Sequence, residues 1–441
     1  MLNSPGLAGF SSGLKLDSTK SFTATGHIAK LVGLTLESVG PMCSVGDLLA
    51  VSSGRDGKEQ LAEVVGFRDN RVLLFPLDSI DGVRCGDKVR LVNEGFRVPV
   101  GEGMLGRVVD GLGRPIDSDE PLRYDALWPV RRAAPNSMLR SRISEHFTTG
   151  VRSIDACLSC GSGQRMGIFA GSGVGKSTVL GMICRNAASS VNVVALIGER
   201  GKEVLDFIED SLGEEGMKRS IVVVSTSDKS PLQRVKGAEV AMAMAEYFRA
   251  QGNRVLFVMD SITRYAMAQR EIGLSIGEPP ATRGYPPSVF SMMPALLERA
   301  GNSDKGSITG FFTVLVEGDD MNDPIGDTAR GILDGHIVLT RELAAQGHYP
   351  AVDVLQSISR VMSSVVPKEQ QLMAQEMRKL LSAYKRAEDM INIGAYKAGS
   401  NPEIDRAIAK RAAIQAFLMQ EVADNAKFQD TLAKMKAIFA K

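Results

Sequence analysis

The stretch AGSGVGKST, residues 170–178, decides the fold of this chain. It lies between two apolar runs, MGIF at 166–169 and VLGMI at 179–183. A phosphate-binding loop needs glycines where the backbone approaches an anion or has a positive φ, with a helix N-terminus behind them. The stretch departs from the pattern GxxxxGK[ST] only at Ala170, which is nearly as compact as glycine. It therefore predicts a nucleotide-binding loop between a buried strand and a helix.

The residues of this loop have separate expected roles toward ATP and Mg²⁺. Lys176 is expected to contact the β- and γ-phosphates, and Ser177 to place its hydroxyl on Mg²⁺. The expected nucleotide-binding residues of the loop are Ala170, Gly171, Ser172, Gly173, Val174, Gly175, Lys176, Ser177 and Thr178.

Two acids follow other apolar runs. Asp260 comes directly after VLFVM (255–259), which is typical of a fully buried parallel strand, and is the second candidate Mg²⁺ ligand. Glu199 follows VALIG (194–198). Because ligands of open α/β sheets bind at the carboxyl ends of the strands, we expect Glu199 beside the phosphates, where it can orient and polarise water.

The 441 residues exceed what one hydrophobic core holds, since cores stop growing near about 250–300 residues. Between about 145 and 366, six strand patterns alternate with helical patterns, which implies right-handed crossovers and a parallel sheet. These strands are expected at 166–170, 191–197, 221–224, 255–259, 310–316 and 337–340. The expected order is a flexible tail (1–20), a small β-barrel domain (21–97), a connector (98–144), an α/β core (145–366) and a helical C-terminal domain (367–441). In the last of these, Asn401 and Pro402 predict the start of a helix.

Composition excludes several classes of protein. The net charge of +1 gives no electrostatic argument for nucleic-acid binding. No apolar run approaches the ~20 residues that span a bilayer, and the N-terminus lacks a secretory signal, so a cytoplasmic location is expected. The five cysteines have no disulfide-framework spacing, and Cys157 and Cys160 are expected to be small buried residues.

Several long motifs resemble the catalytic subunits of rotary ATP synthases and, more closely, the ATPases of bacterial type III protein export. The segment at 315–339, LVEGDDMNDPIGDTARGILDGHIVL, is similar to the export branch specifically. The similarity runs from about residue 25 to the C-terminus. The other motifs are GERGKEV (198–204), MDSITRYAMAQREI (259–272), EPPATRGYPPSVFSMMPALLERAG (278–301) and HYPAVDVLQSISR (348–360).

The resemblance implies a RecA-like P-loop NTPase core and a role for each of four residues, and it places a fifth, Arg264. Glu199 corresponds to the catalytic carboxylate that activates water, and Arg200 to its neighbouring charge partner. Tyr349 matches the tyrosine that stacks on adenine. Arg360 matches the arginine finger that an adjacent subunit donates to neutralise charge on the γ-phosphoryl oxygens. Arg264 lies at the start of the helix that follows Asp260.

The family also implies a set of partners and a location. The chain is expected to form a homohexameric ring at the export apparatus, cytoplasmic and peripheral to the inner membrane. Expected partners are regulatory stator-like and central-stalk-like export proteins, chaperone–substrate complexes and the export gate at the membrane.

The stretch FAGSGVGKS favours flagellar export. Three alternative functions stay open at this point. An injectisome ATPase has closely similar motifs. A hexameric RNA translocase needs stacking aromatics among basic residues in its barrel, whereas this segment offers Phe22, Phe67, Phe75 and Phe96 in apolar or mixed surroundings. A non-catalytic subunit of a rotary synthase typically carries Gln where this chain has Glu199.

Overall fold

The computed structural model describes residues 24–52, 59–79, 81–316 and 323–440. The chain forms two compact units that divide between Glu94 and Gly95. The flexible tail expected at 1–20 lies outside the described residues. In the described part of the chain, no helix has the length and apolar content needed to cross a membrane.

The first unit is a closed β-barrel with the strand order β1-β2-β5-β4-β3-β6. Alternating apolar side chains fill its interior, and three of them, Ile28, Leu49 and Leu74, are at most 1% exposed. Asp69 and Asn70 have φ of 47° and 59°, which is the conformation of a tight hairpin turn between β4 and β5. The strands are β1 (Thr25–Val32), β2 (Thr35–Val39), β3 (Leu48–Ser52), β4 (Glu59–Arg68), β5 (Arg71–Pro76) and β6 (Lys88–Asn93).

The second unit is built on a sheet with the order β19-β18-β12-β17-β15-β13-β14-β8. All neighbours along this path are parallel except β18 and β19, which pair antiparallel. The strands are β8 (Val108–Asp110), β12 (Arg165–Ala170), β13 (Val191–Ile197), β14 (Ser220–Ser225), β15 (Arg254–Asp260), β17 (Ser307–Leu315), β18 (Gly335–Leu339) and β19 (Val352–Ser359), and β16 (Gly301–Asn302) pairs with β17 off the path.

The six predicted strands of the α/β core are confirmed as β12, β13, β14, β15, β17 and β18. Three strands of this sheet were not predicted: β8, β19 and the two-residue β16. Strand β8 lies in the segment expected to be a connector, and its three buried residues extend the sheet beyond β14. The antiparallel β19 covers the opposite edge.

Helices pack against this sheet and connect its strands. Helix α5 contacts β13, β14 and β15, while α6 and α8 both contact β17. The helices of this part are α1 (Arg152–Cys157), α2 (Lys176–Asn186), α3 (Gly201–Asp206), the π-helical turn η3 (Phe207–Leu212), α4 (Gly213–Met217), α5 (Pro231–Ala250), α6 (Ile262–Ser275), α7 (Pro287–Leu297), α8 (Pro324–Ile332), α9 (Arg341–Ala345) and α10 (Met362–Val365). The remaining short elements are β7 (Arg97–Val100) paired with β9 (Ala126–Pro129), β10 (His146–Phe147) paired with β11 (Cys160–Gly161), and the 3₁₀ turns η1 (Glu102–Met104), η2 (Ser137–Leu139) and η4 (Thr282–Gly284).

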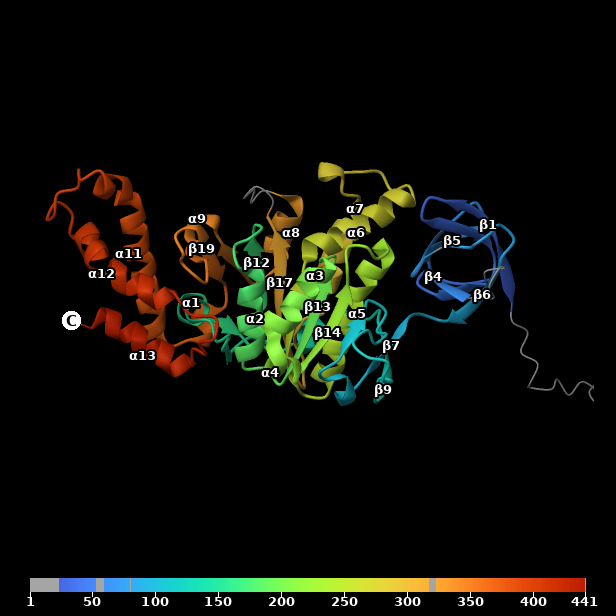
Figure 1. Cartoon of the computed structure of the whole chain (residues 1–441), viewed down its shortest axis with the longest axis horizontal. Coiled ribbons are helices and arrows are strands. Elements are labelled where there is room, and N and C mark those ends of the chain that lie inside the picture. Colours follow the sequence, from blue (N-terminus) through green and yellow to red (C-terminus); the bar gives the residue numbers. More distant parts are fainter. Residues whose placement is uncertain (1–23, 53–58, 80, 317–322, 441) are drawn as a thin grey trace, which may run out of the picture. The chain divides into compact units, whose positions relative to one another are not determined.

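The C-terminal part is helical, as predicted, and consists of α11 (Lys368–Asn392), α12 (Pro402–Leu418) and α13 (Phe428–Phe439). Figure 1 shows these helices gathered at one end of the core, where α11 contacts β19 and α13 contacts α1. The predicted start of α12 is confirmed, since the Asn401 side chain accepts hydrogen bonds from the backbone N–H groups of Glu403 and Ile404. One apolar cluster runs from the sheet into these helices, so they share the core of the second unit.

Cys157 and Cys160 are buried and free, as predicted. Burial raises the pKa of the Cys157 thiol to about 12, so the thiol stays protonated. The spacing of this pair therefore reflects packing beside the phosphate-loop strand and no redox chemistry.

Candidate active site

The phosphate loop joins the end of β12 to the start of α2. Gly173 and Gly175 have φ of 79° and 85°, a conformation that side chains rarely adopt. Gly175 stands at the N-cap of α2, so the free N–H groups and the positive end of the helix dipole face the loop. Val174 is 1% exposed and anchors the loop in the core.

A cavity of about 600 Å³ opens above this loop. Except for Val174, every predicted loop residue lines it, together with Glu199 and Arg200. Its other lining residues are Glu203, Arg264, Leu315, Val316 and Arg341. The structure thus brings the loop and the predicted carboxylate to one site.

Lys176 lies between two carboxylates in this site. Its Nζ is 2.6 Å from Oδ1 of Asp260 and 3.5 Å from Oε1 of Glu199. Burial lowers the pKa of Lys176, but Asp260 and Glu199 together outweigh this and hold the pKa above its ordinary value. The lysine therefore stays charged, and phosphate oxygens would replace the carboxylates as its partners.

Glu199 is 9% exposed and has an unusual protonation equilibrium. Burial, the charge of Asp260 and a hydrogen bond with Glu203 raise its pKa to about 7, while Lys176 opposes the shift. The same hydrogen bond lowers the pKa of Glu203, so the proton of the pair resides on Glu199. Gly198, with φ of 75°, turns the chain toward this position, where a Cβ would lie 2.7 Å from the Cβ of Arg264.

Asp260 lies beneath the cavity at the end of β15, with 3% exposure. Its Oδ1 accepts hydrogen bonds from the Thr313 hydroxyl at 2.7 Å and from Lys176. Among the described residues, no group of three His, Cys, Asp or Glu side chains is arranged to hold a metal. The oxygens of Asp260 and Ser177 fit Mg²⁺ nonetheless, because Mg²⁺ at phosphate sites takes few protein ligands and completes its shell with phosphate and water.

A second cavity, of about 350 Å³, adjoins the loop at Gly175 and Thr178. Tyr349, which is 46% exposed, lies on its wall. Residues 419–422 form another part of the wall, and the backbone N–H of Gln420 donates to the carbonyl of Tyr349 at 2.9 Å. No pattern in the sequence pointed to this C-terminal wall.

Arg200 does not pair with Glu199, which corrects the expected contact. Its Nη1 lies 3.8 Å from Oε1 of Glu203, and its side chain is 81% exposed. The physical reason is that Arg200 has extended backbone angles at the N-cap of α3, where consecutive side chains point in opposite directions.

Arg360 is absent from the described linings of both cavities. Its Nη2 donates to the carbonyl of Arg330 at 3.1 Å, and its side chain is exposed. Over the described ranges of the chain, Arg360 forms no ion pair with an acid.

The sequence analysis missed three polar residues at or beneath this site: Arg341, Glu203 and Thr313. Arg341 begins α9 directly after β18 and lines the loop cavity. The rule that placed Glu199 also applies to Arg341, since both follow a buried strand of a parallel sheet. Thr313 lies inside β17, where sequence alone has no signal for a bond to Asp260.

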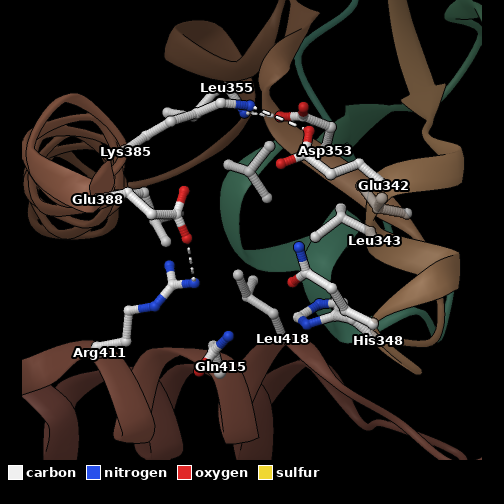
Figure 2. Close-up of a pocket in the computed structure, with 14 residues that line it drawn as sticks. Glu342, Leu343, His348, Asp353, Leu355, Lys385, Glu388, Arg411, Gln415 and Leu418 are labelled. Atoms are coloured by element: carbon white, nitrogen blue, oxygen red, sulfur yellow. Dashed lines mark hydrogen bonds and ion pairs between the residues drawn. The ribbon is translucent and has the colours of Figure 1, made fainter. Parts of the chain in front are cut away.

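A third cavity, of about 80 Å³, lies between α9 and the helices α11 and α12. Figure 2 shows Lys385 directed toward Glu342 and Arg411 toward Glu388, at 3.4 Å and 3.8 Å. It is too small for a nucleotide and contains no predicted site residue. The loop cavity is therefore the candidate active site.

Comparisons with known proteins place the chain in a family. Residues 28–93 match the beta-barrel domain and residues 150–359 the nucleotide-binding domain of the ATP synthase alpha/beta family. Residues 366–437 match the C-terminal domain of the ATPase EscN of type III secretion systems.

Relatives cover nearly the whole chain. The flagellum-specific ATP synthase of Bacillus subtilis is 51% identical over 96% of this chain and 97% of its own. The type 3 secretion system ATPase of Sinorhizobium fredii is 47% identical over 94% and 92%. The structure of the assembled ATPase EscN from enteropathogenic E. coli has a TM-score of 0.89 and 45% identity, over 94% of this chain and 100% of that one. This chain therefore belongs to the ATPases of type III protein export, the family that includes flagellum-specific ATP synthases and type 3 secretion system ATPases.

Proposed function

We propose that the chain hydrolyses Mg²⁺-bound ATP at sites shared between adjacent copies in a homohexameric ring, and that it serves flagellar export. The observation that carries the shared site is the separation of two groups. Glu199 lines the loop cavity of its own chain, whereas Arg360 lies outside that cavity with an exposed guanidinium. A site that needs both groups takes Arg360 from a neighbour.

The residues of the loop cavity divide the work. Lys176 exchanges its two carboxylate partners for phosphate oxygens, and the N-terminal N–H groups of α2 bind the same phosphates. Ser177 and Asp260 would hold Mg²⁺, which when bound neutralises charge on the phosphate oxygens. Glu199 orients the attacking water. Tyr349 provides a face for adenine beside the wall at 419–422.

Relatives support an assembly and a stalk partner. One solved structure is the assembled EscN, and another is EscN in complex with its central stalk EscO, with 44% identity to this chain. We extend these properties to a homohexamer with a central-stalk-like partner. A stator-like regulator, chaperone–substrate complexes and the membrane export gate complete the proposed partners, with the ring cytoplasmic and peripheral to the inner membrane.

The flagellar assignment draws on three relatives named flagellum-specific, at 51%, 49% and 48% identity. Other relatives named flagellum-specific are 45% to 47% identical, and two type 3 secretion ATPases are 47% identical. Affinity purification of the tagged chain from its own cells tests the flagellar assignment. Flagellar export components among the captured proteins support the assignment, and injectisome components contradict it.

Mixing two inactive variants tests the shared site. Glu199→Gln and Arg360→Ala chains are each expected to lose hydrolysis alone. Randomly mixed rings regain about a quarter of the wild-type rate, because about one ordered interface in four joins an intact Glu199 to a neighbour's intact Arg360. Co-purification through a tag on one variant confirms mixing. Mixed rings without recovered turnover would show that the two groups act within one chain or not at all.

A further inference from the structure

The aromatic ring just before the phosphate loop touches the segment that holds Arg360. Phe169 is the residue before Ala170 in β12 and is 1% exposed. The guanidinium carbon of Arg330, on α8, lies 5.2 Å from the centroid of the Phe169 ring. The ring of His336, on β18, meets the same ring edge-on at 5.7 Å. A cation over an aromatic face is attracted by the ring quadrupole, so this contact fixes the Arg330 side chain on β12.

Arg360 is held at two points, and both acceptors are backbone carbonyls of one short segment. Its backbone N–H donates to the carbonyl of Asp334 at 3.0 Å. Its Nη2 donates to the carbonyl of Arg330 at 3.1 Å. The direction of the Arg360 side chain therefore depends on where residues 330–334 lie.

This segment is attached to β12 at both ends of the strand. At the first residue, Arg165 forms a bidentate pair with Asp334, with Nε and Nη2 at 3.0 Å and 3.1 Å from the two carboxylate oxygens. The Asp334 N–H also donates to the Arg165 carbonyl at 2.9 Å. Near the last residue of the strand, Arg330 rests on Phe169. Strand β12, which leads into the chain's own phosphate loop, thus also holds the segment 330–334 that contacts Arg360.

We propose that Arg330 is a positioning residue for Arg360. The Arg330 side chain docks on Phe169 and thereby orients Arg360 toward the neighbouring subunit. This inference rests on the proposed shared site. Of the two attachments, Arg330 is the direct one, because the residue whose side chain docks on β12 also supplies the carbonyl that Nη2 of Arg360 contacts. Removing the guanidinium removes the side-chain contact that holds this end of α8 on β12, while the Arg165–Asp334 pair still holds the backbone of Arg360.

The proposal predicts an asymmetry that a general structural role does not produce. In the mixture described above, the Arg360→Ala chain supplies the working active site and the Glu199→Gln chain supplies the working arginine. Arg330→Met in the chain that supplies the arginine lowers the recovered turnover by about two- to fivefold, the range expected for a partly exposed cation–π contact. Arg330→Met in the chain that supplies the active site retains the rate of the unaltered mixture.

Three further readouts separate positioning from misfolding. The loss falls on kcat with KM for ATP unchanged, because the arginine acts on the transition state. Arg330→Lys restores part of the rate, since an ammonium also binds the ring face. Asp327→Asn, an exposed change on the same helix, has no effect in either chain. Circular dichroism and co-purification establish that each mixture is folded and mixed.

Each outcome decides a different point. A loss confined to the chain that supplies the arginine supports the proposal. Equal losses in both arrangements, a loss confined to the chain with the active site, or no loss in either overturns it while the shared site stands. If the unaltered mixture regains no turnover, the shared site itself is wrong and the role of Arg330 falls with it.

Discussion

At the scale of residues, the site holds one lysine between two acids that compete for it. Lys176 lies 2.6 Å from Asp260 and 3.5 Å from Glu199, and Glu199 takes a proton at a pKa of about 7 because it is buried beside the charge of Asp260. When Lys176 binds phosphate in place of the carboxylates, the ionised form of Glu199 loses a stabilising cation. The protonation state of Glu199 is thus linked to the occupancy of the loop.

The first prediction concerns the pH dependence of hydrolysis. The pH profile of kcat/KM reports the pKa values of the free enzyme, and Glu199 must be deprotonated to activate water. With its pKa at about 7, kcat/KM falls about tenfold for each pH unit below that value and is constant above it. Initial rates at low ATP from about pH 5.5 to pH 8.5 measure this. A flat profile between about pH 6 and pH 8 would remove Glu199 as the base.

The second prediction follows from the same pKa through its linkage to stability. The pKa of Glu199 is raised from 4.5 to about 7 on folding, so its stabilising contribution is complete below about 4.5 and is lost as the pH rises through about 7. Glu199→Gln, which never ionises, therefore has a higher Tm than the wild type at about pH 8 without nucleotide, and the difference vanishes near about pH 4.5. Thermal melts at both pH values test this, with the exposed Glu209→Gln as the matched control. A Tm difference that does not change with pH contradicts the assignment.

At the scale of elements, the strands and helices that follow from local pattern were predictable, and those that depend on distant partners were not. The prediction of the phosphate loop needed only residues 166–183, because their glycines and flanking apolar runs are sufficient to identify it. Strand β8 has three residues and exists because β14 offers an edge. Residues 419–422 meet Tyr349 only because α12 packs back on the core. Arg200 was expected to contact Glu199, and the sequence does not give the direction of a side chain at a helix N-cap.

The third prediction concerns the contact between α5 and the end of α7. Arg299 pairs with Glu246 through two bonds of 2.9 Å, and both side chains are at most 5% exposed. Arg299→Met leaves a buried carboxylate without its partner and lowers the free energy of unfolding by about 3–5 kcal/mol. Lys218→Met, which breaks a pair exposed by 68% and 82%, leaves the free energy of unfolding nearly unchanged, because solvent screens an exposed pair.

Urea unfolding, followed by circular dichroism, measures both variants. The double variant Glu246→Met with Arg299→Met regains most of the loss, because no unpaired charge stays buried. Equal losses for Arg299→Met and Lys218→Met would mean that the buried pair contributes no more than a surface pair.

At the scale of the whole molecule, neither the net charge nor the aromatic residues of the barrel favour RNA binding. The net charge is +1, and in the barrel Phe75 is 1% exposed while Phe67 is 54% exposed. Binding of single-stranded RNA needs several exposed aromatics in a basic groove. The described barrel offers no such row.

The fourth prediction is therefore that RNA leaves hydrolysis unchanged. Turnover is measured with and without poly-C RNA at physiological salt, because phosphate contacts at low salt bind many proteins without specificity. A known RNA translocase serves as the positive control. A several-fold stimulation of this chain would favour the translocase function.

The central claim is that Glu199 activates the attacking water in the cavity where Lys176 binds the phosphates, and one comparison tests it directly. Binding of a fluorescent ATP analogue and Mg²⁺-dependent turnover are measured at about pH 8 for the wild type, Glu199→Gln and Lys176→Ala, with the exposed Lys202→Ala as control. Glu199→Gln is predicted to bind like the wild type and to lose about 10²–10⁴-fold in kcat, whereas Lys176→Ala loses binding and turnover together. A Glu199→Gln chain that keeps most of the wild-type rate would contradict the claim.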